Sequence, residues 1–344
     1  IFFWVARMIM AGIEFLDEIP FKDVYFTSIL RDKDGKKFSK SLGNSPDPFT
    51  LFEEYGTDAV RFATMLMSPQ GLDVLFSNDR LEIGRNFMNK LWNASRFVHM
   101  NLDDLKNDND KLDISQLEEP ERWILNRLDE TAVEVNKLLN KFKFNEAAKL
   151  IYEFTWNDYC DWYIEIAKTR FYGNDNKKKE LAQKVAVKTL KGILILLHPY
   201  APFITEEIWS FFRNKDDLDL IVSPWINPHE FIPDDDALKS FEVIKSTISA
   251  VRMIRSKMNV PSNKRSNVII RKGEKFESII QNNSAIIKSL GNIENISFSN
   301  DSKKPKKSAT VVTNQMEIFI PLEGLIDFEI EISRLSKRLN ELDK

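Results

Sequence analysis

The sequence is poor in cysteine and histidine. Its 344 residues include one Cys, Cys160, and three widely separated His, at positions 99, 198 and 229. A single Cys can form neither an internal disulfide nor a zinc site built on thiolates, and the scattered His lack the close spacing of a His-rich metal site. We therefore expect no protein-bound structural metal and a reducing, cytoplasmic environment.

The sequence also lacks a long apolar run and an excess of positive charge. The apolar run at residues 1–16 is interrupted by Arg7 and Glu14, and it is shorter than the about 20 residues that span a bilayer. We expect a buried helix of an α/β domain there and no membrane segment. The formal net charge is −3, so any contact with nucleic acid must come from local basic patches.

What the sequence does contain is enough apolar material for several cores. Hydrophobic residues make up 43% of the chain, and 25 residues are Phe. A chain of this length is expected to form about two or three domains. It opens with Ile1 inside an apolar run and stops at Lys344 within a helical pattern that has no stop signal, so we expect a piece of a longer protein.

The most informative stretch is Lys37-Phe38-Ser39-Lys40-Ser41. A predicted strand at residues 23–30 leads into it, and glycines on both sides indicate a mobile surface loop. Lysine is a compact cation on a flexible stem, so two lysines three residues apart could clamp the charge on departing pyrophosphate when ATP is attacked at its α-phosphorus. On composition alone, a solvated Lys/Ser loop remains the alternative.

Hydrophobic periodicity predicts a mainly α fold. Helix, strand and loop at the start indicate the closing unit of a parallel sheet. A long helix follows from about residue 79 to 102, and after an acidic linker four helices with short polar links predict a bundle. Short strands around a helix at 274–289 predict a small α+β unit. The last pattern is a heptad seam on Phe328, Ile332, Leu335, Leu339 and Leu342, the start of a coiled coil.

One helical face of the predicted bundle carries three carboxylates, Asp158, Asp161 and Glu165. They could hold a cation, but oxygen-ligand cages need more donors than this, so we favour a partly buried face that pairs with arginines. The aromatic residues around them could stack on unpaired bases. Their helical spacing favours a place in the core instead.

The strongest basic patch lies near the C-terminal end of a predicted helix at 238–257. From residue 246 to residue 272 the sequence has no Asp or Glu. An acid-free run with arginines three apart is typical of a surface that follows phosphates. The predicted RNA-binding residues are Arg252, Arg255, Lys257, Lys264 and Arg265.

The double-lysine stretch and its flanks resemble a known family. Lys37-Phe38-Ser39-Lys40-Ser41 is similar to the KMSKS signature of class I aminoacyl-tRNA synthetases, with Phe38 in place of the usual Met. Further runs resemble the valyl-tRNA synthetase family in order and spacing, and together the resemblance covers nearly the whole chain. These runs are FWVARMIM (3–10), FKDVY (21–25), NKLWNASR (89–96), DWYIE (161–165), HPYAPFITEEIW (198–209) and MNVP (258–261).

The resemblance implies a domain order. We expect this to be a C-terminal fragment that lacks the half of the catalytic domain with the HIGH motif and the editing domain. The implied regions are the end of a Rossmann-like catalytic domain with the KMSKS-type loop (1–70), a stem-contact helical region (71–119), an anticodon-binding helix bundle (120–235), a small α+β domain with the basic patch (236–325) and the start of a C-terminal coiled coil (326–344).

The resemblance also implies chemistry. Members of the family activate valine with ATP and transfer it to tRNA(Val). Lys40 would stabilise charge on the phosphates and Lys37 would assist, while Phe38, Ser39 and Ser41 would shape the loop around ATP, which carries Mg²⁺ without a protein cage. The implied partners are tRNA(Val), valine and ATP, for a cytoplasmic monomer that binds no membrane.

Three alternatives stay open at this point. The chain could be a fragment of an isoleucyl-tRNA synthetase, although the heptad seam and the run FFWVAR (2–7) favour valine. It could act only as a non-catalytic tRNA-binding module, and we expect no aminoacylation by this chain alone. A helical scaffold without RNA would leave the double-lysine loop and the acid-free patch unexplained.

Overall fold

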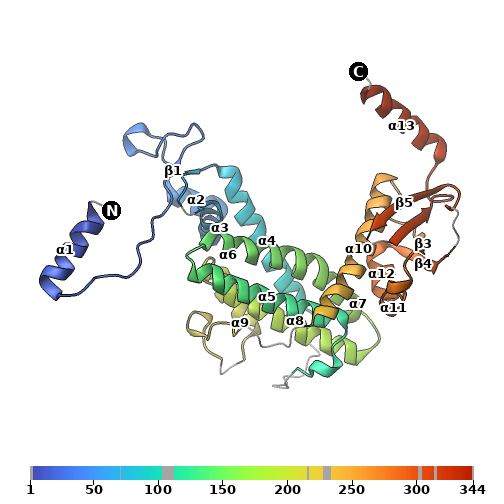
Figure 1. Ribbon diagram of the computed structural model, residues 1–344, viewed down its shortest axis with the longest axis horizontal. Coiled ribbons are helices and arrows are strands. Elements are labelled where there is room, and N and C mark those ends of the chain that lie inside the picture. The colour runs from blue at the N-terminus through green and yellow to red at the C-terminus, as the bar shows by residue number, and fades with distance from the viewer. Residues whose placement is uncertain are drawn as a thin grey trace.

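The computed structural model describes residues 3–69, 71–102, 112–214, 217–227, 234–300, 304–313 and 316–342. These residues form mainly helices, which confirms the predicted mainly α class. Figure 1 shows an open U: a helical bundle forms the base, the N-terminal segments lie on one side, and a small sheet with its helices lies on the other. Within the described ranges, no helix is both long and apolar enough to cross a membrane.

The N-terminal helix stands apart from the rest of the chain (Figure 1). Helix α1 (Trp4–Leu16) buries only Gly12. The prediction that this helix is covered on most sides is therefore wrong for this chain. Its exposed apolar side chains include Trp4, Met8, Met10, Ile13, Phe15 and Leu16.

The strand predicted at residues 23–30 is also mostly absent. Only β1 (Leu30–Arg31) is a strand, and it pairs in parallel with β2 (Val74–Leu75). Residues 21–29 have no regular secondary structure. β-branched and aromatic residues favour a strand only where a neighbouring strand supplies hydrogen bonds, and within the described chain just two residues of β2 do so.

The segment after the double-lysine loop folds into three packed helices. They are the helices α2 (Pro48–Tyr55), α3 (Thr57–Met67) and α4 (Asn78–His99). The side chain of Asp47 caps α2 by accepting from the backbone N of Phe49 and Thr50. Helices α3 and α4 pack so closely that a Cβ on Gly84 would overlap with the carbonyl oxygen of Ala59. Only glycine fits at that position.

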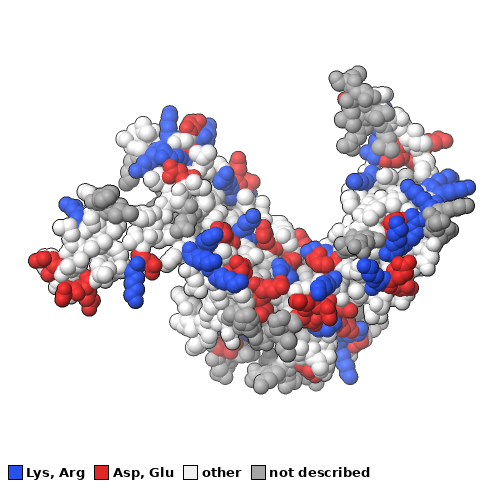
Figure 2. All heavy atoms as spheres, viewed as in Figure 1, with Lys and Arg blue, Asp and Glu red and all other residues white. Residues whose placement is uncertain are grey.

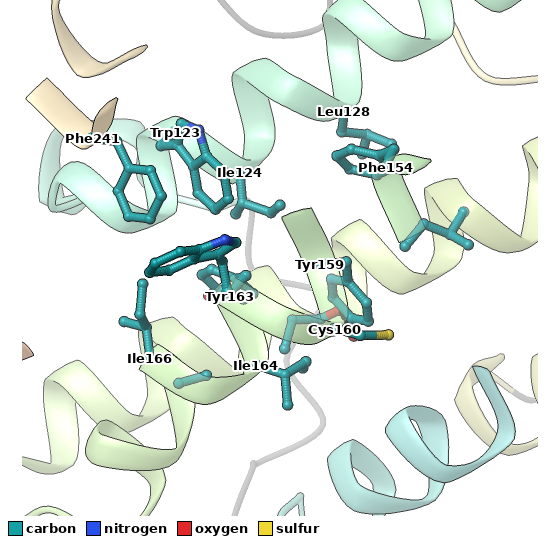
Figure 3. Close-up of a cluster of buried hydrophobic side chains, with 14 of the residues drawn as sticks. Trp123, Ile124, Leu128, Phe154, Tyr159, Cys160, Tyr163, Ile164, Ile166 and Phe241 are labelled. Atoms are coloured by element: carbon teal, nitrogen blue, oxygen red, sulfur yellow. Dashed lines mark hydrogen bonds between the residues drawn. The ribbon is translucent and has the colours of Figure 1, made fainter. Parts of the chain in front are cut away.

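The predicted bundle is confirmed. Its main helices pack around one large apolar core, part of which is shown in Figure 3. The helices are α5 (Glu119–Asn140), α6 (Phe144–Glu153), α7 (Ile164–Phe171), α8 (Asn176–Leu197) and α9 (Pro202–Phe212). Short 3-10 turns lie beside the bundle, namely η2 (Ile114–Gln116) and η4 (Leu220–Val222).

A π-helical segment, η3 (Phe154–Tyr163), joins α6 to α7. The sequence predicts one uninterrupted helix at about 146–171, with Asn145 as its cap. The wider turns of η3 bring Tyr159 and Tyr163 against α8, where their hydroxyls donate to the carbonyls of Ala186 at 3.0 Å and Ala182 at 3.3 Å. Both tyrosines are fully buried (Figure 3), which confirms that these aromatic residues belong to the core.

The C-terminal unit is a four-stranded sheet with helices. The long helix α10 (Asp235–Lys257) leads into it. The strand order is β4-β3-β6-β5, with β3 parallel to β4 and antiparallel to β6. The strands are β3 (Ser266–Arg271), β4 (Ile293–Phe298), β5 (Ser308–Thr313) and β6 (Met316–Pro321), and the short helices are η5 (Glu274–Phe276), α11 (Glu277–Asn282) and α12 (Ser284–Gly291).

The chain ends in a helix that projects from this unit, α13 (Phe328–Leu342) (Figure 1). This confirms the predicted helix. The predicted heptad seam depends on the side chains of Leu335, Leu339 and Leu342, which lie outside the described residues.

Candidate functional site

The double-lysine loop, residues 31–44, begins where β1 ends. A tight turn reverses the chain, with the backbone N of Gly35 donating to the carbonyl of Asp32 at 3.0 Å. Gly35 has φ +78°, a left-handed conformation that other residues adopt at a cost. An isolated antiparallel bridge between Arg31 and Lys37 closes the turn. The first lysine of the motif therefore has a fixed backbone position beside the strand.

Asn44 and Asp32 hold the rest of the loop. The side-chain amide of Asn44 donates to Asp32 Oδ2 at 2.8 Å and to the carbonyl of Lys37 at 3.3 Å. Its carbonyl oxygen accepts from the backbone N of Ser39 at 2.9 Å. One Asn thus bridges both sides of the motif. Neither Asn44 nor Asp32 was among the predicted site residues, because their contact spans twelve positions and leaves no local sequence pattern.

The hydrogen bond from Asn44 also acts on the charge of Asp32. Together with backbone N–H groups of Lys36 and Asp34, it holds the pKa of the Asp32 carboxyl below its usual range. The ionised carboxylate is therefore the form that the folded loop favours. This contribution to loop order is present above the usual pKa of Asp and is lost as the pH falls through the lowered pKa.

Phe38 anchors the middle of the loop. Its ring lies 5.8 Å from the ring of Phe76 in an edge-to-face arrangement. It packs against a small core that is separate from that of the bundle, formed by Leu51, Val60, Ala63, Phe76 and Leu81. A large apolar side chain is what this position requires, so Phe in place of Met keeps the packing.

The polar motif residues differ in how they are placed. Lys37 is exposed and has no ion pair with another described residue. Ser39 and Ser41 share a hydrogen bond between their Oγ atoms at 2.7 Å. Lys40 begins the 3-10 turn η1 (Lys40–Leu42), and its side chain lies outside the described residues. The loop therefore presents Lys37 to solvent, where a polyphosphate could reach it.

Replacing Asn44 by Ala is expected to loosen the loop. The change removes three hydrogen bonds that join both sides of the motif, so local opening should become easier. Hydrogen exchange of the amides at residues 36–41 should speed up by about tenfold. The exposed neighbour Ser45, changed to Ala, is the control and should leave these rates unchanged. Equal rates in the two variants would show that Asn44 does not order the loop.

The five predicted RNA-binding residues lie around the C-terminal end of α10, and some of their side chains already form hydrogen bonds within the protein. Lys257 and Arg265 are exposed. Lys264 donates to the carbonyls of Gly324 at 2.7 Å and Leu325 at 3.2 Å. Arg252 is exposed and donates to the carbonyl of Leu290 at 2.9 Å. Figure 2 shows several Lys and Arg side chains on the unit that carries the sheet, whereas both signs of charge mix over the bundle.

Arg255 differs from the other four because it is only 8% exposed. Its guanidinium donates to Ser266 Oγ at 2.6 Å and to the carbonyl of Pro261 at 3.1 Å. These bonds fasten the end of α10 to β3. The burial argues against direct contact of Arg255 with phosphate, and the spacing of three residues could not distinguish an inward from an outward arginine.

The three carboxylates singled out in the bundle face basic side chains. Asp158 pairs with Arg127 at 3.1 Å, Asp161 with Lys90 at 2.5 Å and Glu165 with Lys168 at 2.6 Å. The predicted pairing with arginine is correct for Asp158 alone, because the partners of Asp161 and Glu165 are lysines. Over the described part of the chain, no group of three or more His, Cys, Asp and Glu has the arrangement of a metal site.

Two family models match the chain. The model described as tRNA synthetases class I (I, L, M and V) matches residues 1–77, which include the double-lysine loop. The model described as anticodon-binding domain of tRNA ligase matches residues 121–270, which include the bundle and α10. The chain belongs to the class I tRNA synthetases.

Curated valine–tRNA ligases are similar to this synthetase chain along its whole length. The identity is 44% with the protein from Syntrophotalea carbinolica, covering 100% of this chain and 38% of the relative. It is 43% with the protein from Fusobacterium nucleatum (100% and 39%) and 40% with that from Thermotoga maritima (100% and 38%). The chain thus spans less than two fifths of the length of these relatives.

A solved structure also shares the fold of this synthetase chain. It is described as a ternary complex of LeuRS from Agrobacterium radiobacter K84 with tRNA and LeuAMS. The TM-score is 0.51 at 22% identity, covering 66% of this chain and 27% of that chain. The likeness supports the fold of the class I synthetases and leaves the choice of amino acid to other observations.

Proposed function

We propose that this chain is the C-terminal part of a valine–tRNA ligase, which activates valine with ATP and transfers it to tRNA(Val). The observation that carries the proposal is the double-lysine loop, which Asn44 and Phe38 hold in place beside β1. The names of the curated relatives support valine over isoleucine. We propose a cytoplasmic location, because charged tRNA is used in the cytoplasm. The proposed state of the protein is a monomer.

The loop would act on the leaving group of the first step. The carboxylate of valine attacks the α-phosphorus of ATP, the bond to the bridging oxygen breaks, and negative charge accumulates on pyrophosphate. Lys40 is proposed to stabilise that charge, and Lys37 to assist from its exposed position. Ser39 and Ser41 are proposed to shape the loop around the nucleotide. Mg²⁺ enters with ATP as part of the substrate.

The bundle and the end of α10 are proposed to bind tRNA. The match of an anticodon-binding model to residues 121–270 supports this for the bundle. The acid-free run from residue 246 to 272 supports it for Arg252, Lys257, Lys264 and Arg265, all of which are exposed. Positive charge of this kind gives affinity through release of counterions and does not itself read sequence.

Neutralising two exposed charges of the patch, Lys257 and Arg265, should change how tRNA binding depends on salt. With Lys257→Gln and Arg265→Gln together, the slope of log affinity for tRNA(Val) against log salt should become shallower by about one to two units, because each lost phosphate contact removes about 0.7 to 0.9. The change should be the same for tRNA(Ile). The measurement is a salt titration of binding by this chain.

The control for position is Lys239→Gln, which removes one positive charge elsewhere on α10. Lys239 is also exposed on α10, but it lies near the other end of the helix, outside the acid-free run. Its removal should leave the slope unchanged. If Lys239→Gln and the double variant have the same effect, the patch at the end of α10 does not contact tRNA.

A further inference from the structure

Helix α3 has two faces that pack into two different cores. Val60 and Ala63 belong to the small core under the double-lysine loop, in which the ring of Phe38 sits. On the other face, Phe62 belongs to the core of the bundle, with its ring 4.8 Å from that of Phe87 and 6.3 Å from that of Tyr152. Figure 1 shows α3 between the loop side and the bundle. The position of α3 therefore sets the position of the loop relative to the bundle.

One side chain ties the start of α3 to the bundle. Asp58, in the first turn of α3, is 7% exposed, and its Oδ2 accepts from the backbone N of Ile204 at 2.6 Å. Ile204 lies in the first turn of α9, a helix that has no capping side chain before it. Asp58 thus supplies the cap of α9 from a residue 146 positions away. The partial positive charge at a helix N-terminus favours a carboxylate at this place.

Holding the Asp58 carboxylate in this buried position costs free energy of desolvation. Burial raises the pKa of the Asp58 carboxyl. This shift is opposed by the backbone amides of Ile204 and Phe203 and by the charges of Arg61 and His198. Its second oxygen, Oδ1, is buried and has no partner among the described residues. A buried carboxylate that is only partly satisfied adds little net stability. What the contact does provide is one defined position of α3 against α9.

We propose that Asp58 is a positioning residue for the double-lysine loop. By holding the first turn of α3 at the N-terminus of α9, it fixes Val60 and Ala63, and thereby the seat of Phe38. A second contact supports this joint: Arg61, one turn along α3, donates to the carbonyl of Pro199 at 3.3 Å. The inference rests on the proposed function, because it assigns to Asp58 an effect on ATP activation.

The test uses the full-length ligase with Asp58→Ala, assayed by valine-dependent exchange of pyrophosphate into ATP. We expect kcat/KM for ATP to fall about tenfold, with KM for valine unchanged, because the loop serves the phosphates. Ile204 is the third residue of α9, where the backbone N–H has no acceptor within the helix, so Ile204→Pro removes the donor of the same bond without breaking a hydrogen bond inside α9. It should give the same pattern. Asp58→Asn keeps an acceptor oxygen and should retain activity within about threefold.

The control separates position from stability. Phe62→Leu weakens the packing of the same helix and leaves the Asp58–Ile204 bond in place, so it should lower Tm but keep kcat/KM for ATP within about twofold. If Phe62→Leu causes the same loss as Asp58→Ala at the same loss of Tm, Asp58 is merely structural and the inference fails. Lys40→Ala tests the proposed function separately. Should Lys40→Ala abolish exchange while Asp58→Ala and Ile204→Pro do not affect it, only the inference is overturned.

Discussion

Replacing Lys40 by Ala in the full-length protein is expected to slow formation of valyl-adenylate by about 10²- to 10³-fold, the usual cost of losing one preorganised group that stabilises developing charge. The reason is that the proposed contact of Lys40 strengthens only as charge moves onto pyrophosphate. The effect should therefore fall on kcat for valine-dependent pyrophosphate exchange. The affinity for tRNA(Val) should stay unchanged, because tRNA is proposed to bind at the bundle and at the end of α10.

The control is Lys33→Ala in the same loop. Lys33 is exposed and lies outside the five-residue motif, so its removal lowers the net charge of the loop by the same amount. If general positive charge were enough, Lys33→Ala and Lys40→Ala would slow exchange equally. A loss of tRNA affinity by Lys40→Ala as large as its loss of exchange would also contradict the assignment.

The sequence predicts most helices correctly because their signals are local. The apolar period of α4, the start of α5 near Pro120 and the breaks around Pro199 and Pro202 depend only on neighbouring residues. The same holds for β3 to β6, whose β-branched runs lie close together in sequence and find partners within the same unit.

The failures occur where structure depends on partners distant in sequence or absent from the described chain. The predicted strand at 23–30 finds only two residues of β2 to pair with, and the apolar sides of α1 find no cover. The π-helical turns of η3 depend on how α6 and α7 fit around α8, which no period of 3.6 residues records.

The site shows the same division. The spacing of Lys37 and Lys40 locates the loop, since a motif of lysines and small residues is a local pattern. Nothing local marks Asn44 as the residue that holds the loop, or Asp58 as the cap of a helix 146 residues away. Arg255 looks like its neighbours on α10 in sequence, and only the fold shows that it points to β3.

The second large effect is expected at a buried ion pair where the bundle begins. Arg170 of α7, only 7% exposed, pairs with Glu121 of α5, which is fully buried, and with Glu118 at 2.8 Å. Burial raises the pKa of Glu121, and the guanidinium of Arg170 opposes this shift. The carboxylate therefore depends on Arg170 to stay ionised without a large penalty.

Replacing Arg170 by Met should lower the free energy of unfolding by about 3 to 5 kcal/mol, because it leaves a buried carboxylate without its partner. The measurement is urea unfolding of this chain, followed by the fluorescence of tryptophan; Trp123 lies in the bundle core (Figure 3). A loss below about 1 kcal/mol would mean that the pair behaves like an exposed salt bridge.

The double variant Arg170→Met with Glu121→Leu separates the value of the pair from the penalty of the orphaned charge. It should recover most of the lost stability, since an apolar pair of similar volume often replaces a buried ion pair at little cost. The single variant Arg170→Met should also recover as the pH falls. A carboxyl whose pKa is raised in the folded state destabilises the fold as the pH rises above its unfolded pKa, so the deficit is smallest when Glu121 is protonated. If the double variant is as unstable as Arg170→Met and the deficit does not change with pH, packing around Arg170, and not the charge of Glu121, accounts for the loss.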